Sequence, residues 1–523
     1  MRFVDRFDIV SSFGKYLSNQ YIKKKRLIML TQREFPELKA ALQRIWGYSD
    51  FRYPQAEVVK SLLQDKDALI VMPTGGGKSI CFQLPALLQD GLTLVLSPLI
   101  ALMENQVQQL RAKQLPAALL HSQQPRDQRQ NILKAIAEPS LRLLYLSPET
   151  LLSPPVWSSL IQPQVKINGI ILDEAHCLVQ WGTTFRPAYT RLGAARAALS
   201  KIHSQKIAIA AFTATADHLT QKTITKTLRL SQPEKFLLSP YRANLHLQVK
   251  TIWTRAGRRE QTLKFIQNKP NQSGLIYVRS RRDSEELADW LRSRSASLSA
   301  RSRQLKTFAY HAGLSDRQRR KIETQWLQGD IPFVICTSAF GMGIDKRDCR
   351  WVVHYHIPEL LSEYMQEIGR SGRDGKVAQT LALVSEPTGW LDPSDKQRSQ
   401  FFTRQLLQKA RQAQQIMQQI PEQGNIEQVI AEFPQSAIAL SILQSLDCLS
   451  WKDPFHYKKT SSLVDCNHWI NKQKYYQKQM RQFVQTKQCR WQFLLEAFGF
   501  KEESLGLNCC NCDRCKQNLY ESR

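Results

Sequence analysis

Long apolar runs are missing from this chain of 523 residues. No stretch approaches the ~18 consecutive apolar residues that a membrane-spanning helix requires. The first 30 residues also lack the apolar core of a secretory signal, because Asp5, Asp8 and the run Lys23-Lys24-Lys25 interrupt them. We therefore expect a soluble, intracellular protein with no membrane partner.

Acidic residues are scarce relative to basic ones. The chain has 45 Asp and Glu against 73 Lys and Arg, which gives a formal charge of +28 at pH 7. The hydrophobic content of 42% and the aromatic content of 9% are those of a folded protein, which excludes a disordered basic tail as the source of the charge. The densest basic stretch, residues 242–321, has 19 Lys and Arg against 6 Asp and Glu. A surface excess of this size indicates a polyanionic partner.

A disulfide framework is not indicated by the 11 cysteines, because they are distributed unevenly. Five of them fall in the last 35 residues, and the others are scattered in apolar or motif surroundings. This placement favours a reducing compartment and one local metal site.

Short β-like runs alternate with helical stretches in two successive series. This alternation predicts βαβ units, and hence an α/β fold with two tandem lobes, each built on a doubly wound parallel sheet. The boundary is expected near Pro240–Arg242. The predicted strands are 68–72, 92–96, 141–146, 170–172 and 207–212 in the first series, and 275–278, 307–310, 333–335, 351–355 and 380–384 in the second.

The alternation stops after about residue 400. A Gln-rich helix is predicted over 401–420, then a helix-turn-helix over 426–449 and a hairpin over 451–457. That order is typical of a winged helix, and a short helical spacer fits it nearly as well. The first 28 residues and the Ser/Arg-rich loop 292–303 receive no functional role.

The strongest local motif is the glycine-rich segment 72–79, Met-Pro-Thr-Gly-Gly-Gly-Lys-Ser, which directly follows a predicted strand. Glycines allow backbone N–H groups and the next helix N-terminus to wrap a phosphate chain. Lys78 would reach the terminal phosphates, and Ser79 would ligate Mg²⁺. The segment therefore predicts a nucleotide site formed by Thr74, Gly75, Gly76, Gly77, Lys78 and Ser79.

Two carboxylates end another predicted strand, in the segment 170–176, Ile-Ile-Leu-Asp-Glu-Ala-His. Asp173 is placed to hold the metal ion, and Glu174 to orient and deprotonate the attacking water. Beside a phosphate loop, this pair indicates NTP hydrolysis, with His176 as a further site residue.

A third motif lies in the second lobe, over residues 366–373, Gln-Glu-Ile-Gly-Arg-Ser-Gly-Arg. Arg370 and Arg373 suit stabilisation of the charge that develops on a transferred phosphate, which would tie hydrolysis to closure of the two lobes. Gln366 opens the motif and is assigned to the same site.

Further segments in the same order identify the chain as similar to a known family. They are 46–55 (WGYSDFRYPQ), 97–102 (SPLIAL), 147–149 (SPE), 173–177 (DEAHC), 181–187 (WGTTFRP), 212–216 (FTATA), 310–314 (YHAGL) and 337–346 (TSAFGMGIDK). With the motifs above, they resemble superfamily 2 helicases and, more closely, the RecQ family, over about residues 35–385 and again over 485–516.

The resemblance implies two RecA-like lobes, ATP as the nucleotide, and 3′→5′ movement along single-stranded DNA with duplex unwinding in DNA repair or recombination. Gln55 would read the adenine edge while Tyr48 and Arg52 stack on its ring, which agrees with the chemistry of these side chains. The matching segments also assign nucleotide contacts to Gly343 and Asp345, and DNA contacts to Ser97 and Thr337.

Residues 180–186, the aromatic-rich segment, resemble the RecQ loop that senses single-stranded DNA and couples it to hydrolysis. Trp181 and Phe185 would stack on bases, and Arg186 would contact a phosphate. The family usually has His-Asp where this chain has Thr183-Thr184.

The cysteine cluster is the second mark of the family. Cys509, Cys512 and Cys515 follow a C-x-x-C-x-x-C pattern, and Cys489 opens a predicted helix 20 positions earlier. Four thiolates complete a tetrahedral Zn²⁺ site, and this set resembles the RecQ zinc-binding subdomain. The adjacent Cys510 leaves open which of Cys509 and Cys510 is the ligand.

The predicted organisation is a basic extension (1–28), an ATP-binding lobe (29–240), a second lobe (241–399), a helical, winged-helix-like segment (400–484), a zinc-binding subdomain (485–516) and a tail (517–523). Single-stranded and forked DNA are the expected partners, with a single-strand-binding protein or a topoisomerase as candidate protein partners. We expect the protein in the cytoplasm, at a bacterial-type nucleoid, or otherwise inside the cell. The alternatives are a superfamily 2 RNA helicase and a DNA-binding scaffold that does not unwind efficiently.

Overall fold

The computed structural model describes residues 35–180, 182, 185–296, 305–341, 344–461 and 463–521. The chain divides into two compact units. The first comprises residues 1–214, 219–238 and 413–464, and the second comprises 215–218, 239–412 and 465–523. The predicted basic extension and most of the Ser/Arg-rich loop lie outside the described residues.

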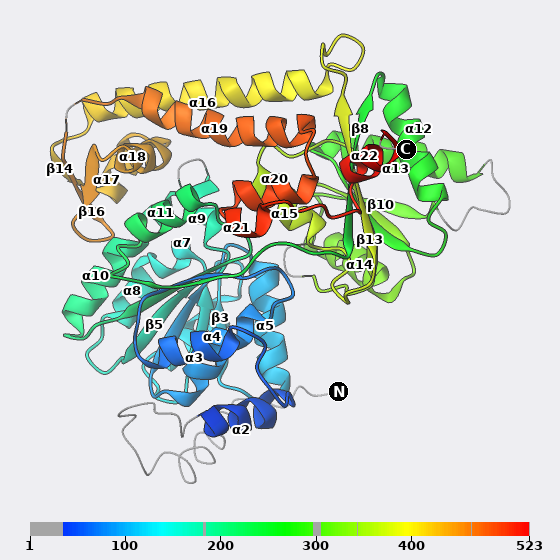
Figure 1. The fold of residues 1–523 in the computed structure, drawn as a ribbon. Helices are drawn as coiled ribbons and strands as arrows, with labels where there is room; N and C mark the ends of the chain where they lie inside the picture. The colour runs from blue at the N-terminus through cyan, green and yellow to red at the C-terminus, as the bar shows by residue number, and fades with distance from the viewer. Residues whose placement is uncertain are drawn as a thin grey trace. The chain divides into compact units, whose positions relative to one another are not determined.

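The first unit is built on a seven-stranded parallel sheet, shown in blue to green in Figure 1. Its five interior strands carry almost continuous apolar sequence and are largely buried, as expected where helices cover both faces. The strand order is β3 (Ala117–Leu120), β4 (Leu143–Leu146), β2 (Leu92–Leu96), β5 (Ile167–Leu172), β6 (Ala208–Thr213), β1 (Ala68–Val71) and β7 (Glu234–Leu237).

The helices of this unit fill the connections between parallel strands. Two apolar clusters, one on each face of the sheet, form the core. The helices are α2 (Phe35–Trp46), α3 (Gln55–Leu63), α4 (Lys78–Leu88), α5 (Ile100–Ala112), α6 (Arg126–Ala135), α7 (Pro148–Leu151), α8 (Pro154–Leu160), α9 (His176–Gln180), the 3-10 helix η2 (Pro187–Arg191), α10 (Leu192–Ile202) and α11 (His218–Thr227).

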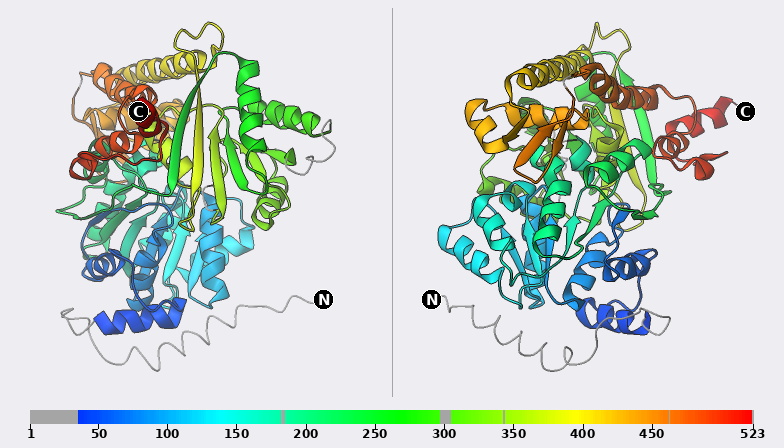
Figure 2. Two further views of the ribbon diagram at one scale, coloured as in Figure 1. Left: turned by 45° about the vertical axis from the view of Figure 1, so that its right-hand side comes forward. Right: turned by 90° about the vertical axis from the view of Figure 1, so that its left-hand side faces the viewer.

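The second unit has a six-stranded parallel sheet, which faces the viewer in the left-hand view of Figure 2. The strand order is β10 (Thr307–Tyr310), β11 (Phe333–Cys336), β9 (Ser273–Tyr277), β12 (Cys349–His354), β13 (Ala378–Ser385) and β8 (Leu245–Ile252). The helices between these strands are α12 (Arg255–Gln267), α13 (Arg281–Ala296), α14 (Asp316–Gln328) and α15 (Leu361–Ile368). Two tandem parallel-sheet lobes, the predicted fold class, are therefore confirmed.

Two long helices follow the second sheet and run side by side (Figure 1). They are α16 (Ser394–Gln419) and α19 (Cys466–Gln485). Cys466 donates its thiol hydrogen to the carbonyl of Ala410, and Arg481 donates to the hydroxyl of Ser399 at 2.6 Å. The division between the two units falls inside α16, between residues 412 and 413.

Residues 413–464, here called the inserted module, belong to the first unit. They contain a three-stranded antiparallel sheet in the order β14, β16, β15, which is visible in orange in the right-hand view of Figure 2. The predicted helix-turn-helix and hairpin are confirmed, although the second helix ends at Ser445 rather than 449, because Asp447 adopts a left-handed conformation (φ 58°). The elements are β14 (Gln423–Asn425), α17 (Ile426–Glu432), α18 (Ser436–Ser445), β15 (Leu449–Trp451) and β16 (His456–Lys459).

The chain ends in three helices of the second unit, α20 (Arg490–Ala497), α21 (Lys501–Ser504) and α22 (Asp513–Glu521). They pack against β8 and α15, with Trp491 fully buried at the centre. Its indole N–H donates to the carbonyl of Leu245 in β8 at 3.1 Å. In the described part of the chain, no helix is long and apolar enough to cross a bilayer.

Candidate functional site

The glycine-rich segment forms a loop between β1 and α4. Gly75 (φ 85°) and Gly77 (φ 77°) have left-handed backbones, which glycine adopts without the steric penalty of a side chain. A Cβ on Gly76 would lie 3.0 Å from the carbonyl oxygen of Pro73. The sequence thus folds into a tight loop that ends at the N-terminus of α4, where free N–H groups attract anions.

Lys78 opens α4 and points back over the loop. Its Nζ donates to the carbonyl of Met72 at 3.2 Å. Thr74 and Ser79 flank the glycines on either side and are half-buried. The loop therefore gathers a cation, two hydroxyl side chains and backbone N–H groups around one space.

Gln55 holds this loop from the side. The residue is buried, and its Nε2 donates to the carbonyls of Gly76 at 3.2 Å and Gly77 at 3.3 Å. Its Oε1 accepts the backbone N–H of Arg52 at 2.9 Å. Tyr48 and Arg52 precede it with exposed side chains. The sequence pointed to a contact between Gln55 and the nucleotide, and the structure adds that Gln55 braces the phosphate loop.

The two carboxylates follow β5, two strands away from the loop. The backbone N–H of Asp173 donates to the carbonyl of Leu96 in β2 at 2.8 Å, and its Oδ2 accepts from Gln106 at 3.4 Å. Burial, followed by the charge of Glu174, raises the pKa of Asp173 to about 6, while the charge of Lys78 opposes the rise. A divalent cation would relieve this repulsion, which makes the donor set chemically suited to Mg²⁺.

His176 joins these carboxylates to the neighbouring strand. Its buried ring places Nδ1 3.3 Å from Glu174 Oε2 and 3.1 Å from the hydroxyl of Thr213, which ends β6. Burial lowers the pKa of His176, so the ring is neutral at pH 7. Thr213 was missed as a site residue, although its segment 212–216 contributed to the family resemblance; its position at the end of a strand next to β5 was the available signal.

The aromatic-rich segment follows α9 directly. Trp181, Thr183 and Thr184 lie outside the described residues, whereas Gly182 is buried and Phe185 is 68% exposed. Arg186 Nη1 lies 3.7 Å from Glu149 Oε2 of α7.

Ser97 is buried where β2 ends, at the same edge of the sheet as the carboxylates. The structure thus places Ser97 after a strand of this edge, and Phe185 and Arg186 after α9, the helix that begins at His176. Parallel strands make this arrangement, because their carboxyl ends all meet at one edge.

In the second unit, Arg370 and Arg373 extend from the turn after α15. Arg370 donates to the carbonyl of Gly341, and Arg373 donates to Asp345 Oδ1 at 2.9 Å and to the carbonyl of Ile344 at 2.9 Å. Burial and the charge of Arg370 lower the pKa of Arg373. The structure therefore joins Asp345 and both arginines in one cluster. Gly343 lies outside the described residues.

Gln366 lies on α15 itself, and Thr337 is half-buried just after β11. The backbone N–H of Thr337 donates to the carbonyl of Tyr310 at 3.1 Å, so the turn that carries it is anchored to β10.

A buried ion pair that the sequence did not reveal holds α15 in place. Glu367 accepts two hydrogen bonds from Arg279, at 2.8 and 2.6 Å, and its Oε2 lies 2.8 Å from His354 Nε2. Burial raises the pKa of Glu367, but the charge and hydrogen bonds of Arg279 and His354 outweigh it and lower the value to about 2. The fixed helix carries Gln366 and leads into the arginine turn.

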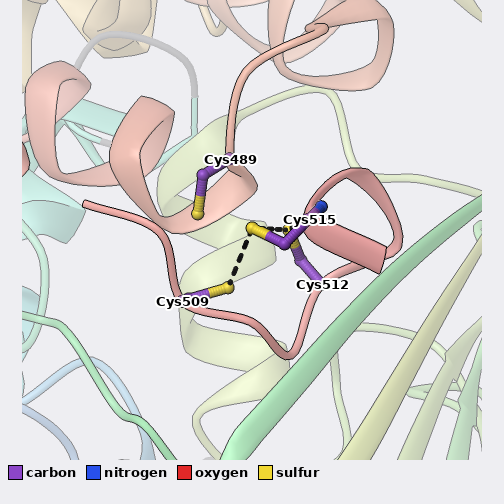
Figure 3. A group of neighbouring side chains, drawn as sticks. All are labelled: Cys489, Cys509, Cys512 and Cys515. Carbon is purple, nitrogen blue, oxygen red and sulfur yellow. Dashed lines mark hydrogen bonds between the residues drawn. The ribbon is translucent and has the colours of Figure 1, made fainter. Parts of the chain in front are cut away.

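The four expected zinc ligands meet at one point (Figure 3). The sulfur atoms of Cys489, Cys509, Cys512 and Cys515 all lie within 4.8 Å of one another, and two of the pairs are 3.4 and 3.8 Å apart. Four sulfurs at about 2.3 Å from a shared Zn²⁺ would be about 3.8 Å apart, so the set fits a tetrahedral ion. Cys510 is exposed and outside the cluster, which selects Cys509 over Cys510.

Two backbone N–H groups favour a thiolate at Cys512, whereas burial opposes a thiolate at Cys515 when no cation is near. The backbone N–H groups of Arg490 and Cys515 each donate to Cys512 Sγ at 3.5 Å. Burial and the neighbouring sulfur of Cys512 raise the pKa of Cys515 to about 12. Four thiolates in one buried place require a cation, and the cluster is suited to supply a structural zinc site.

Comparison with known proteins shows which family this chain belongs to. A model of the DEAD/DEAH box helicase family matches residues 52–224, and one of the helicase conserved C-terminal domain matches residues 257–375. The "ATP-dependent DNA helicase RecQ" of Synechocystis is 51% identical over 478 residues, which are 91% of this chain and 98% of that protein. The chain belongs to the RecQ family of ATP-dependent DNA helicases.

Other RecQ relatives match a smaller share of their own length. The RecQ of Haemophilus influenzae is 38% identical over 360 residues, which cover 68% of this chain and 55% of that protein. The "probable ATP-dependent DNA helicase RecS" of Bacillus subtilis is 38% identical over 348 residues, 66% of each chain.

Solved structures support the fold alone, at low identity. The Mycobacterium smegmatis helicase Lhr, bound to single-stranded DNA and AMP-PNP, has a TM-score of 0.54 at 20% identity and covers 80% of this chain and 61% of its own. Dbp5 of Saccharomyces cerevisiae, bound to RNA and ADP BeF3, has a TM-score of 0.53 at 16% identity and covers 69% and 90%. The two lobes of this RecQ-family chain are RecA-like.

Proposed function

We propose that the protein hydrolyses ATP to move 3′→5′ along single-stranded DNA and to unwind duplexes during DNA repair or recombination. The observation that carries the proposal is the phosphate loop with Lys78 beside the Asp173 and Glu174 carboxylates, in a chain of the RecQ family. The charge of Lys78 acts on Asp173, so the loop and the carboxylates share one electrostatic site.

The predicted site residues of the first unit each contribute to one part of ATP hydrolysis. The loop N–H groups and Lys78 bind and orient the phosphates of ATP, and Ser79 and Asp173 would hold Mg²⁺, which supplies charge neutralisation at the phosphate oxygens. Glu174 accepts a proton from the attacking water. His176 lies between the side chain of Glu174 and the hydroxyl of Thr213 on the next strand, and it helps to position Glu174.

The remaining predicted site residues have two roles. One group binds the adenine base, and the other stabilises the transition state. Tyr48 and Arg52 stack on adenine, and Gln55 contacts both its edge and the loop. Arg370 and Arg373 stabilise the negative charge on the transferred phosphate, and Gln366, Gly343 and Asp345 are assigned to the same step.

DNA contacts are proposed for Ser97, Thr337 and the aromatic-rich segment with Trp181, Phe185 and Arg186. The exposed ring of Phe185 suits stacking on a base, and Arg186 suits a phosphate. The four-cysteine cluster holds Zn²⁺ as a structural ion. A single-strand-binding protein or a topoisomerase is the proposed class of protein partner.

ATP turnover with single-stranded DNA, single-stranded RNA or no nucleic acid tests the proposal. We expect strong stimulation by DNA, weak stimulation by RNA, and unwinding only of duplexes with a 3′ single-stranded tail. An RNA preference would favour the other candidate, an RNA helicase, and DNA binding without turnover would favour a scaffold.

Lys78→Ala should bind DNA with unchanged affinity but lose ATP turnover by at least about 100-fold, because the terminal phosphates lose their cation. The matched control is Lys113→Ala, which changes an exposed lysine at the end of α5 in the same lobe. Turnover near the wild-type level in Lys78→Ala would refute the mechanism.

A further inference from the structure

The inserted module packs on the part of the first unit that frames the aromatic-rich segment. Ser441 of α18 donates its hydroxyl hydrogen to the carbonyl of Gly182 at 2.9 Å, and its Oγ lies 3.0 Å from the hydroxyl of Thr190 in η2. These residues are about 250 positions apart in the chain, and Ser441 and Thr190 are 1% and 5% exposed. The contact is therefore a buried polar junction.

Further hydrogen bonds surround this junction. Gln444, one turn after Ser441, donates to the carbonyl of Thr190 at 2.9 Å and accepts the indole N–H of Trp451 at 2.7 Å. Arg191 donates to the carbonyl of Pro454 at 2.9 Å. A buried network of this kind favours one arrangement of its members, because each displaced group would lose its partner away from water.

A second set of contacts widens the interface. The rings of Trp157 and Phe455 meet edge to face with centroids 5.3 Å apart, and Arg229 donates to the carbonyl of Trp451 at 2.7 Å. The inserted module thus rests on α8, η2 and the loop after α11, all within the first unit.

Gly182 is held from two directions. Its N–H donates to the carbonyls of Cys177 at 3.1 Å and Leu178 at 3.2 Å in α9, while its own carbonyl accepts from Ser441. A side chain at this position would collide with the carbonyl of Leu178, so the close approach requires glycine. Because α9 begins at His176, the bonded path from Ser441 to the hydrolytic carboxylates is short.

We propose that the inserted module is a positioning element for the aromatic-rich segment, and that Ser441 holds Gly182 so that DNA contact at this segment changes ATP turnover through α9. The inference rests on the proposed function, in which the segment contacts single-stranded DNA. Ser441 contacts neither ATP nor DNA in this scheme and is a positioning residue.

Ser441→Ala removes the hydroxyl and leaves the Gly182 carbonyl buried without its donor. Loss of one buried hydrogen bond changes a coupled equilibrium by about tenfold. We expect the ratio of DNA-stimulated to DNA-independent turnover to fall by about tenfold, with DNA-independent turnover unchanged. Amide hydrogen exchange should rise in the peptides that cover residues 181–190 and stay constant in the phosphate loop.

The matched control is Ser445→Ala on the same helix, where the serine is exposed and its hydroxyl donates within α18 to Ile442. This variant should leave both measurements unchanged. Gln444→Glu is a second probe, because it keeps the shape and the acceptor for Trp451 but loses the donor to Thr190; it should lower the same ratio.

Three outcomes decide the inference. It is overturned if Ser441→Ala and Gln444→Glu keep the wild-type stimulation ratio and exchange pattern, or if they lower all activities equally together with the melting temperature. If the wild-type protein itself shows no stimulation by DNA, the proposed function fails instead. Hydrogen exchange over residues 181–190 then still decides whether Ser441 positions the segment.

Discussion

Gly77 has no side chain, and the structure leaves no room for one. Its left-handed backbone (φ 77°) would strain any other residue, and a Cβ would collide with the Gln55 amide that braces the loop. The residue therefore meets two separate requirements, one from its own backbone and one from a neighbour 22 positions away.

Gly77→Ala should lower kcat/KM for ATP by about 100-fold, mainly through KM, because Gln55 must leave the loop and the N–H groups lose their arrangement. The backbone strain alone costs about 1 kcal/mol of unfolding free energy. Gly329→Ala is the matched control, since Gly329 has a similar backbone (φ 86°) with nothing near its Cβ position. Both variants should lose similar stability in urea unfolding, and only Gly77→Ala should lose ATP affinity.

At the scale of elements, the four-cysteine cluster and the residues beside it connect three separate pieces of the second unit. Arg490 beside the cluster pairs with Asp513 of α22 at 2.5 and 2.8 Å and donates to the carbonyl of Phe483 in α19 at 2.7 Å. Trp491 bonds to β8. Disruption of this cluster would therefore loosen helices and a strand at once, rather than a surface loop.

Cys512→Ser should remove about one Zn²⁺ per chain by elemental analysis, and the melting temperature should fall by about 10 °C or more, because the free energy of metal binding is folding free energy. Cys510→Ser, which changes an exposed thiol two positions before Cys512, should retain zinc and stability. Freshly purified, reduced wild-type protein without zinc would contradict the assignment.

The strands that the sequence predicts are the interior strands of both sheets and one edge strand, β10. The prediction missed β3 and β7, the two edges of the first sheet, and β8, an edge of the second. An edge strand has a neighbour on one side only, so its sequence is shorter or alternates with polar residues, as in β7 (EKFL) and β8 (LHLQVKTI). Central strands are buried on both faces, and their continuous apolar runs are easy to recognise.

The candidate site also contains parts that the sequence predicted and parts that it did not. The phosphate loop, the carboxylates and the cysteines occur in short motifs whose spacing carries the chemistry, and the sequence alone indicated them. The junction of Ser441 with Gly182 links residues 259 positions apart, and the Arg279–Glu367 pair links residues 88 apart. No local pattern encodes such contacts, because they arise only when the chain has folded.

For the whole molecule, the 73 Lys and Arg residues are more than DNA binding can use. Several arginines are buried in ion pairs within one unit, including Arg258 with Asp392 at 2.6 Å and Arg279 with Glu367 at 2.6 Å. Such cations hold the fold and cannot reach a phosphate. Only basic residues that contact the backbone of the nucleic acid release counterions when it binds.

The affinity for single-stranded DNA should therefore depend on salt only through those contacts. About five neutralised phosphates give a slope of about −3.5 in a plot of log Kobs against log salt concentration, whereas all 28 charges would give about −20. Fluorescence anisotropy titrations between about 50 and 300 mM salt measure this slope. Arg186→Gln should make it shallower by about 0.7, because one phosphate contact is lost. A slope near −20 in the wild-type protein, unchanged by Arg186→Gln, would show that DNA binds through diffuse surface charge instead of the aromatic-rich segment.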